Sequence, residues 1–190
     1  VAQDLEPEFI AFSDDGGTAY ATLQENNAVA VIDLASADVT TVLGIGFKEY
    51  GLPGNEIDAS NRDGGVNLNS WSIFGTYMPD GFDSYAVNGV TYLVTANEGD
   101  GREYVSDATD EADCTAQGGF LFDDGDCFHY LDEIRVRDLD ASQFTDDLVA
   151  KLGADFQDQD KLGRLKMITD LGLEDASACT TLPTTCLLYT

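Results

Sequence analysis

Residues 7–34 read PEFIAFSDDGGTAYATLQENNAVAVIDL, and this stretch decides the fold class of the chain. Short runs of apolar and β-branched residues are separated by turns rich in Asp, Asn and Gly, such as residues 13–17. Together with the run that follows this stretch, the predicted strands are residues 8–12, 18–23, 28–32 and 39–43. Four short strands joined by tight turns are typical of one antiparallel blade of a β-propeller. The alternative is a meander within a β-sandwich or barrel.

The strand pattern returns in the middle of the chain, which favours the propeller over that alternative. Asn88-Gly89 is a strong signal for a two-residue hairpin turn, and it separates strand-like residues 84–87 from residues 90–96. Residues 133–136 (EIRV) are predicted to form a third strand of the same blade. They lead into an Asp-Leu pair, as the third strand of the first blade does.

The segments around these strands differ in character. Residues 45–81 are rich in Gly, Asn and Asp but also carry aromatic residues, so we expect a long loop that is anchored to the domain. Residues 143–152 have apolar side chains at helical spacing and end before Gly153, which predicts a short helix. Residues 162–169 then have the composition of a strand that opens a third blade.

A chain of 190 residues with 43% hydrophobic content is long and apolar enough for a folded domain. The predicted architecture is all-β: antiparallel four-stranded blades of an incomplete propeller, with long loops and one or two short helices. Its segments are a first blade at about 7–44, a long loop at 45–81, a second blade at about 82–140 with an acidic insertion at 99–131, and a helix with the start of a third blade at about 141–190.

The charge balance is extreme and limits the classes of partner. The chain has 36 Asp and Glu residues against 9 Lys and Arg residues, a formal net charge of −27. Such a surface attracts cations and repels nucleic-acid phosphates and anionic membranes, so neither of the latter is an expected partner. No apolar run approaches the roughly 18 residues that a membrane-spanning helix needs, so membrane insertion is not expected.

The four cysteines form two close pairs, Cys114 with Cys127 and Cys179 with Cys186. The single histidine of the chain argues against a zinc site built from Cys and His. We therefore predict two local disulfides, each closing a short acidic loop. Disulfides persist in oxidising compartments, which predicts an extracellular protein, either secreted or at the cell surface.

A candidate ligand site lies in residues 92–104, YLVTANEGDGREY, where a predicted strand ends in a group of side-chain oxygens. Glycines next to Asn97, Glu98 and Asp100 let the backbone fold back so that these side chains can converge. Calcium binds oxygen ligands of this kind, and the alternative is a solvated turn, because both use the same residue types. Arg102 can either grip a phosphate group or neutralise Asp100.

A second segment is expected to contribute to this site, because calcium takes roughly six to eight oxygens at about 2.3–2.6 Å. The long loop carries Asp58 and Asp63, and these are the predicted additional ligands. The loop is not an EF-hand, because Arg62 stands where a ligand is needed, and Asx-turns are the alternative. Residues 123–126 are interpreted as a solvated acidic loop. His129 has no evident acid–base partner in the sequence and is interpreted as structural.

Three segments together resemble one known family: residues 7–34 and 92–104, quoted above, and residues 46–68, GFKEYGLPGNEIDASNRDGGVNL. The chain resembles the choice-of-anchor I group, which includes mesenchyme-specific cell-surface glycoproteins and secreted proteins often labelled alkaline-phosphatase-like. The resemblance covers most of residues 7–170 and implies a secreted or surface-bound β-propeller of seven or a similar number of blades. It also implies that the chain corresponds to the N-terminal part of a longer domain. The rest of the propeller would then come from the same precursor or from another chain.

Two classes of function follow from these features. The first is a non-catalytic, extracellular calcium-binding module for matrix, adhesion or biomineral association, which the net charge favours. The second is a metal-dependent, alkaline-phosphatase-like or phytase-like phosphoester hydrolase, in which cations held by carboxylates bind and polarise phosphate. The sequence has no Gly-x-Ser-x-Gly nucleophile motif, so no catalytic residue is assigned and the question of enzymatic activity stays open.

Overall fold

The computed structural model describes residues 2–168 and 188–189 of the chain. These residues fall into two compact units. Unit 1 comprises the chain up to Lys48 and the segment Gly75–Asp100, whereas unit 2 comprises Glu49–Phe74 and the chain from Gly101 to Tyr189. Each unit has sheets and a hydrophobic cluster of its own.

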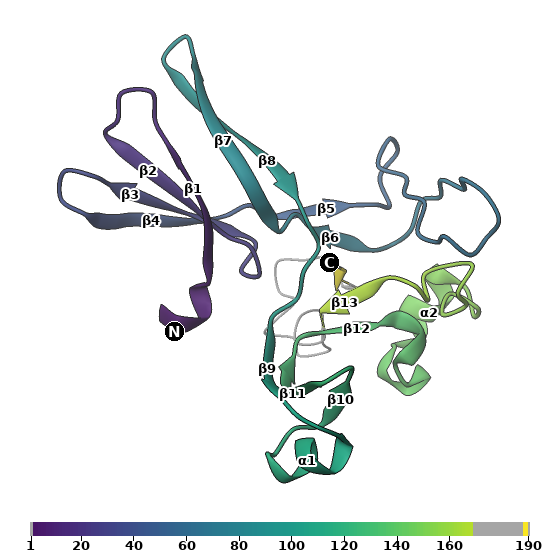
Figure 1. The fold of residues 1–190 in the computed structure, drawn as a ribbon. Coiled ribbons are helices and arrows are strands. Elements are labelled where there is room, and N and C mark those ends of the chain that lie inside the picture. Colours follow the sequence, from purple (N-terminus) through teal and green to yellow (C-terminus); the bar gives the residue numbers. More distant parts are fainter. Residues whose placement is uncertain (1, 169–187, 190) are drawn as a thin grey trace. The chain divides into compact units, whose positions relative to one another are not determined.

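Unit 1 contains the four strands that the opening stretch predicts. They are β1 (Pro7–Phe12), β2 (Thr18–Leu23), β3 (Ala28–Asp33) and β4 (Asp38–Gly44), preceded by the short 3-10 helix η1 (Ala2–Leu5). The strands are antiparallel and lie side by side in chain order (Figure 1). The β1–β2 turn forms because the Asp15 carboxylate accepts the Gly17 N–H (3.0 Å) and the Ser13 hydroxyl (2.7 Å). The four predicted strands and their antiparallel pairing are thus confirmed.

The β1–β4 sheet buries mainly small side chains. Its buried cluster consists of Ala21, Leu23, Ala28 and Ala30. By contrast, every residue of β4 is exposed, and large apolar side chains of the outer strands are in water, such as Phe12 (56% exposed) and Val39 (60% exposed). Within the described residues this sheet therefore leaves part of its apolar surface uncovered.

The second pair of strands in unit 1 is the predicted hairpin. β7 (Pro79–Val87) and β8 (Val90–Asn97) form a two-stranded antiparallel sheet. Asn88 and Gly89 make the turn with φ of +53° and +77°, the conformation that an Asn-Gly hairpin favours. The hairpin is longer than predicted, because β7 begins directly after Met78, whose positive φ of +44° turns the chain ahead of the strand.

The predicted long loop at 45–81 is more structured than expected. It contains β5 (Phe47–Glu49), β6 (Phe74–Thr76) and the start of β7. Between β5 and β6, the Tyr50 N–H donates to the Ile73 carbonyl (3.0 Å) and the Trp71 N–H donates to the Tyr50 carbonyl (3.2 Å). Tyr50 and Trp71 also pack against the core of unit 2, so the predicted anchoring by aromatic residues is confirmed.

From Gly101 on, the predicted acidic insertion at 99–131 is a folded part of unit 2. It contains β9 (Glu103–Asp107), α1 (Glu111–Ala116), β10 (Leu121–Asp123) and β11 (Asp126–Leu131). The strands form an antiparallel sheet in the order β10-β11-β9. Asp124 and Gly125 make the β10–β11 turn with φ of +47° and +101°, so the predicted acidic loop is a tight hairpin turn.

The strand predicted at residues 133–136 lies in a different sheet from the one expected. β12 (Glu133–Arg135) pairs antiparallel with β13 (Lys166–Ile168), in a sheet of order β12-β13-β14-β6-β5 in which β14 is Leu188–Tyr189. The prediction that this strand joins the β7–β8 hairpin is therefore wrong. Its apolar pattern identified a strand, but the choice of partner depends on contacts distant in sequence. Val136, predicted as the last residue of the strand, begins a 3-10 helix instead.

The helical region of unit 2 is divided into short pieces. They are η2 (Val136–Asp138), η3 (Ala141–Gln143) and α2 (Asp146–Leu152). The predicted helix at 143–152 is correct only for α2, because the Thr145 hydroxyl accepts the Leu148 N–H (3.3 Å) and so begins the helix there. Gly153, with φ of +95°, ends α2 as predicted. The strand predicted at 162–169 is likewise shorter and corresponds to β13.

Helix α2 and the following segment supply much of the core of unit 2. The buried cluster consists of Ala59, Ile73, Val136, Leu148, Leu152, Phe156, Leu162 and Met167. Phe144 meets Phe156 edge to face, with ring centroids 4.8 Å apart. Over the described residues, the fold is mostly β with a few short helices, and its antiparallel sheets are not closed. The complete propeller stays a prediction.

Candidate functional site

The end of β8 holds the first group of predicted ligands. Asn97 is the last residue of the strand and lies opposite Pro79, and its side-chain oxygen accepts the Thr95 hydroxyl (2.8 Å). The Glu98 N–H donates to the Met78 carbonyl (3.1 Å), which holds the backbone just beyond the strand. Asn97, Glu98 and Asp100 are all exposed. The predicted position at the end of a strand is thus correct, and the side-chain oxygens there face solvent.

Two side chains from the polar turn between β2 and β3 hold the backbone at this end of unit 1. Gln24, only 4% exposed, donates its side-chain N–H to the Glu98 carbonyl (3.3 Å). The side-chain oxygen of Asn27 accepts the N–H groups of Tyr77 (2.9 Å) and Met78 (3.1 Å), and its amide donates to the Gly46 carbonyl (2.7 Å). Gln24-Glu25-Asn26-Asn27 is an ordinary polar turn in sequence, so nothing local distinguishes these two side chains.

The second group of predicted ligands, Asp58 and Asp63, belongs to unit 2. One carboxylate oxygen of each is buried and has no hydrogen-bond partner among the described residues. The other oxygen of Asp63 accepts the Asn67 amide (2.8 Å). A buried carboxylate oxygen without a donor is unfavourable, and a bound cation is one way to satisfy it.

A pocket of about 400 Å³ opens beside Asp58. It is lined by Asp58, Ala59, Ser60, Asn61, Gly65 and Arg164. The Ser60 side chain is only 7% exposed, and its hydroxyl donates to the Gln159 carbonyl while accepting the Arg62 N–H (2.9 Å). The loop around Asp58 is thereby fastened to the segment that follows α2.

Arg164 is the positively charged side chain of this pocket. Desolvation by its surroundings lowers the pKa of the Arg164 guanidinium, and the charges of Arg135, Arg62 and Arg137 lower that pKa further. The Arg135 guanidinium donates to the main-chain carbonyl of Arg164 (2.7 Å). In a chain of such negative charge, this local concentration of arginine was not visible in the sequence, because the four residues come from three separate segments.

Arg102, the predicted phosphate ligand, directly precedes β9. Its carbonyl accepts the Asp132 N–H (3.2 Å). The neighbouring Gly101 is packed so closely within unit 2 that an added Cβ would lie 2.6 Å from an Asp132 carboxylate oxygen and 2.5 Å from the Glu133 side chain. The backbone before Arg102 therefore needs glycine, and acidic residues of unit 2 border it.

In the part of the chain that the structure describes, no three His, Cys, Asp or Glu side chains gather in the manner of a metal site. Asn97 has an amide side chain and lies outside that set of residue types. The calcium hypothesis for Asn97, Glu98 and Asp100 accordingly stays a prediction.

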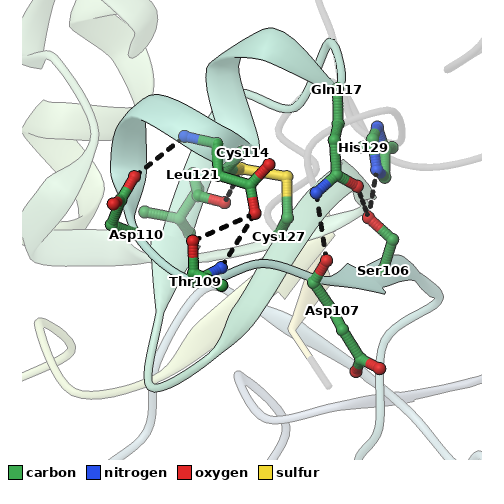
Figure 2. Close-up of a disulfide and its surroundings, with 10 residues drawn as sticks. Ser106, Asp107, Thr109, Asp110, Cys114, Gln117, Leu121, Cys127 and His129 are labelled. Carbon is green, nitrogen blue, oxygen red and sulfur yellow. Dashed lines mark hydrogen bonds between the residues drawn. A yellow bond between two sulfur atoms is a disulfide. The ribbon is translucent and has the colours of Figure 1, made fainter.

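Cys114 and Cys127 form the first predicted disulfide, with an S–S distance of 2.04 Å and Cα atoms 5.1 Å apart (Figure 2). It links α1 to β11. Gly119 lies against it so closely that an added Cβ would be 2.2 Å from the Cys127 sulfur. The second predicted pair, Cys179 with Cys186, lies outside the described residues.

Hydrogen bonds to carboxylates hold α1 in place beside the disulfide. Asp110 caps the helix by accepting the Asp113 N–H (2.9 Å), and Asp113 in turn accepts the Thr109 N–H (3.0 Å) (Figure 2). The Thr109 bond, followed by one with Gln117, lowers the pKa of the Asp113 carboxyl below its ordinary value.

His129 has a partner that the sequence did not reveal. Its Nε2 lies 2.8 Å from the Ser106 hydroxyl, which is also 2.8 Å from the Gln117 side-chain oxygen, and the Gln117 amide donates to the Asp107 carbonyl (Figure 2). Within the described residues no carboxylate orients the other ring nitrogen, and His129 is exposed. The group therefore lacks the third member of a nucleophile–base–acid triad, and the structural interpretation of His129 is retained.

A comparison with protein families identifies the class of this protein. The sequence model of the choice-of-anchor I domain matches residues 1–184. The chain therefore belongs to the choice-of-anchor I family, as its three characteristic segments predicted, and the domain is of a secreted or surface-anchored kind. No helix in the described part of the chain is long and apolar enough to cross a membrane. Searches of curated proteins and of solved structures found no match.

Proposed function

We propose that this domain is a calcium-binding module of the extracellular matrix or cell surface. The observation that carries the proposal is the pair of buried carboxylate oxygens of Asp58 and Asp63, which have no hydrogen-bond partner among the described residues. Charged oxygens in this state favour a bound hard cation, which supplies the missing interaction. Asn97, Glu98 and Asp100 of unit 1 are a second, separate group of candidate oxygen ligands at the end of β8, where hydrogen bonds to the backbone keep the strand end in place.

The net charge of −27 supports the same proposal. Self-repulsion between carboxylates destabilises the compact state, and divalent cations reduce it both by direct ligation and by raising the local positive charge. Calcium bound to the folded state stabilises it by RT ln(1 + [Ca²⁺]/Kd), which is about 2.7 kcal/mol at one hundred times the dissociation constant. Matrix, adhesion or mineral surfaces rich in calcium are the partners that fit such a module.

Thermal unfolding with and without calcium tests the proposal. The thermal midpoint should rise with calcium concentration and should return to its starting value when a chelator is added. Magnesium at the same concentration controls for charge screening, since it favours a smaller octahedral site and keeps more of its water. Equal midpoints in excess calcium and in chelator would contradict the proposal. Hydrolysis of a generic phosphomonoester with and without calcium separates it from the alternative of a phosphoester hydrolase.

We further propose that additional blades cover the β1–β4 sheet. Its outer strands expose Phe12 and Val39, and a blade in a closed propeller is normally covered on both sides by its neighbours. The 190-residue chain alone should therefore bind a hydrophobic dye and associate with itself. A stable monomer of this chain with one sharp unfolding transition would contradict the idea of missing blades.

A further inference from the structure

Unit 2 concentrates most of the arginine of a strongly acidic chain at one place. The sequence has five arginines, and three of them, Arg62, Arg135 and Arg137, lie near enough to Arg164 for their charges to act on its guanidinium. The four residues come from the long loop, from β12 and η2, and from the segment before β13. Like charges repel, so such a cluster is expected only where an anion or a packing requirement offsets the repulsion.

Hydrogen bonds hold the members of this cluster in place. Arg135 donates from its guanidinium to the Arg164 carbonyl (2.7 Å), and the Arg137 N–H donates to the Gly163 carbonyl (3.3 Å). The Arg137 guanidinium also donates to the Gln159 side-chain oxygen (3.3 Å). Because the Gln159 carbonyl accepts the Ser60 hydroxyl, the arginines of β12 and η2 are tied to the loop that carries Arg62.

The guanidinium groups of Arg135 and Arg137 have interaction partners within the described structure, unlike those of Arg62 and Arg164. Arg137 forms an ion pair with Asp138 (3.3 Å), and Arg135 is used to hold the Arg164 backbone. Within the part of the chain that the structure describes, the guanidinium groups of Arg62 and Arg164 make neither an ion pair nor a hydrogen bond. Arg164 nevertheless lines the pocket beside Asp58, together with Ser60 and Asn61.

We propose that the pocket at Arg164, with Arg62 beside it, binds a tetrahedral oxyanion: phosphate or sulfate, either free or as the ester group of a larger molecule. A guanidinium presents parallel N–H groups that match two oxygens of such an anion, and it stays charged at every physiological pH. Arg135 and Arg137 act as positioning residues, since they hold the backbone near Arg164 and add positive charge. The residues that would contact this anion, Arg164 and Arg62, are not among the proposed calcium ligands, although Asp58 of those ligands lines the same pocket.

Among the described residues, Asp58 is the only carboxylate that lines this pocket. It therefore allows a substitution that should strengthen anion binding. Its negative charge opposes an anion bound at Arg164, so removing that charge should strengthen binding. The assay must therefore be free of calcium, because a cation bound by Asp58 would have the same effect as its substitution. Under these conditions, failure of the calcium proposal does not affect the result.

The test is calorimetric titration of the protein with inorganic phosphate and with inorganic sulfate, in calcium-free chloride buffer at constant ionic strength. We expect saturable binding at one site, weakened at least about tenfold by Arg164→Gln and by Arg62→Gln, because each variant removes a charge-assisted contact. Arg62→Lys should restore part of the affinity and Asp58→Asn should increase it. Phenyl phosphate distinguishes the sources: binding as tight as that of inorganic phosphate indicates an ester group, and weaker binding indicates the free ion.

Lys48→Gln is the matched control, because it removes one positive charge from unit 1, whereas the four arginines belong to unit 2. It should leave the affinity unchanged. The Arg62 side chain is exposed and makes no described contact, so Arg62→Gln should keep the fold even if Arg164→Gln does not. Absence of saturable binding, or an equal loss in Lys48→Gln and Arg62→Gln, would overturn the proposal.

Discussion

The β1–β4 sheet of unit 1 and the β10-β11-β9 sheet of unit 2 are both small and antiparallel, but different interactions stabilise them. The first has no cysteine, buries mainly alanine and leaves large apolar side chains of its outer strands exposed. The second is cross-linked by Cys114 and Cys127 and has a helix whose N-terminus is capped. A covalent link can take the place of a large core in a short acidic segment, whereas the larger sheet depends on burial.

Removing the disulfide should give the largest effect and should act on one region only. The Cys114→Ser/Cys127→Ser double variant opens a loop with a sequence separation of 13, which costs about 3 kcal/mol in the chain-entropy account. Hydrogen exchange should then become faster in residues 103–131 and stay unchanged in residues 7–44. Equal acceleration in both regions would show that the two sheets are not stabilised independently.

Asn27 provides the corresponding non-covalent test in unit 1. Asn27→Ala removes three hydrogen bonds to backbone groups and places Ala at a φ of +48°, so it should lower the free energy of unfolding by about 2 kcal/mol. Asn27→Asp keeps the acceptor for Tyr77 and Met78 and loses only the donor to Gly46, so its effect should be smaller. Chemical denaturation measures both, and equal losses would mean that the acceptor contributes little.

Stabilisation by calcium should depend on acidic residues at the end of β8 in unit 1 and not on those of the β10–β11 turn in unit 2. Asp100→Asn and Glu98→Gln, at the end of β8, should each reduce the stabilisation by calcium by about 1 kcal/mol, the scale of one charged contact. Asp124→Asn, in the β10–β11 turn, is the matched control and should change it little. The measurement is the calcium-dependent shift of the thermal midpoint in each variant. An equal reduction in all three variants would point to diffuse charge screening instead of a site.

The smallest expected effect is the pH dependence of the disulfide-linked part of unit 2. Hydrogen bonds from Thr109 and then Gln117 lower the pKa of Asp113, so its contribution to stability is present above the ordinary Asp pKa. The contribution is lost as pH falls through the lowered pKa of the folded state. Asp113→Asn should therefore weaken the acid dependence of hydrogen exchange in α1, without changing that of the β1–β4 sheet. An unchanged acid profile would show that the hydrogen bonds accepted by the Asp113 carboxylate are too exposed to matter.

Local patterns in the sequence were sufficient for the elements that form from neighbouring residues. Turn residues at 13–17 and 88–89 predicted the β1–β2 turn and the β7–β8 hairpin, because side-chain oxygens and positive φ values select those turns directly. Cys114 and Cys127 were paired correctly because they are close in sequence. Gly153 ended α2 as expected, for the same local reason.

Only the tertiary structure decided which distant segments meet. The partner of β12 is β13. The three backbone groups held by Asn27 lie up to 51 residues away. The loop that carries Arg62 is held near the other arginines by the hydrogen bond between Ser60 and Gln159, which are 99 residues apart. Such contacts depend on how loops close and strands pair, and the free energy of a distant pairing is not encoded in local periodicity. The sequence by itself determined the family, the acidic character and the strand-rich local structure, whereas folding created the arginine-lined pocket and the unpaired oxygens of Asp58 and Asp63.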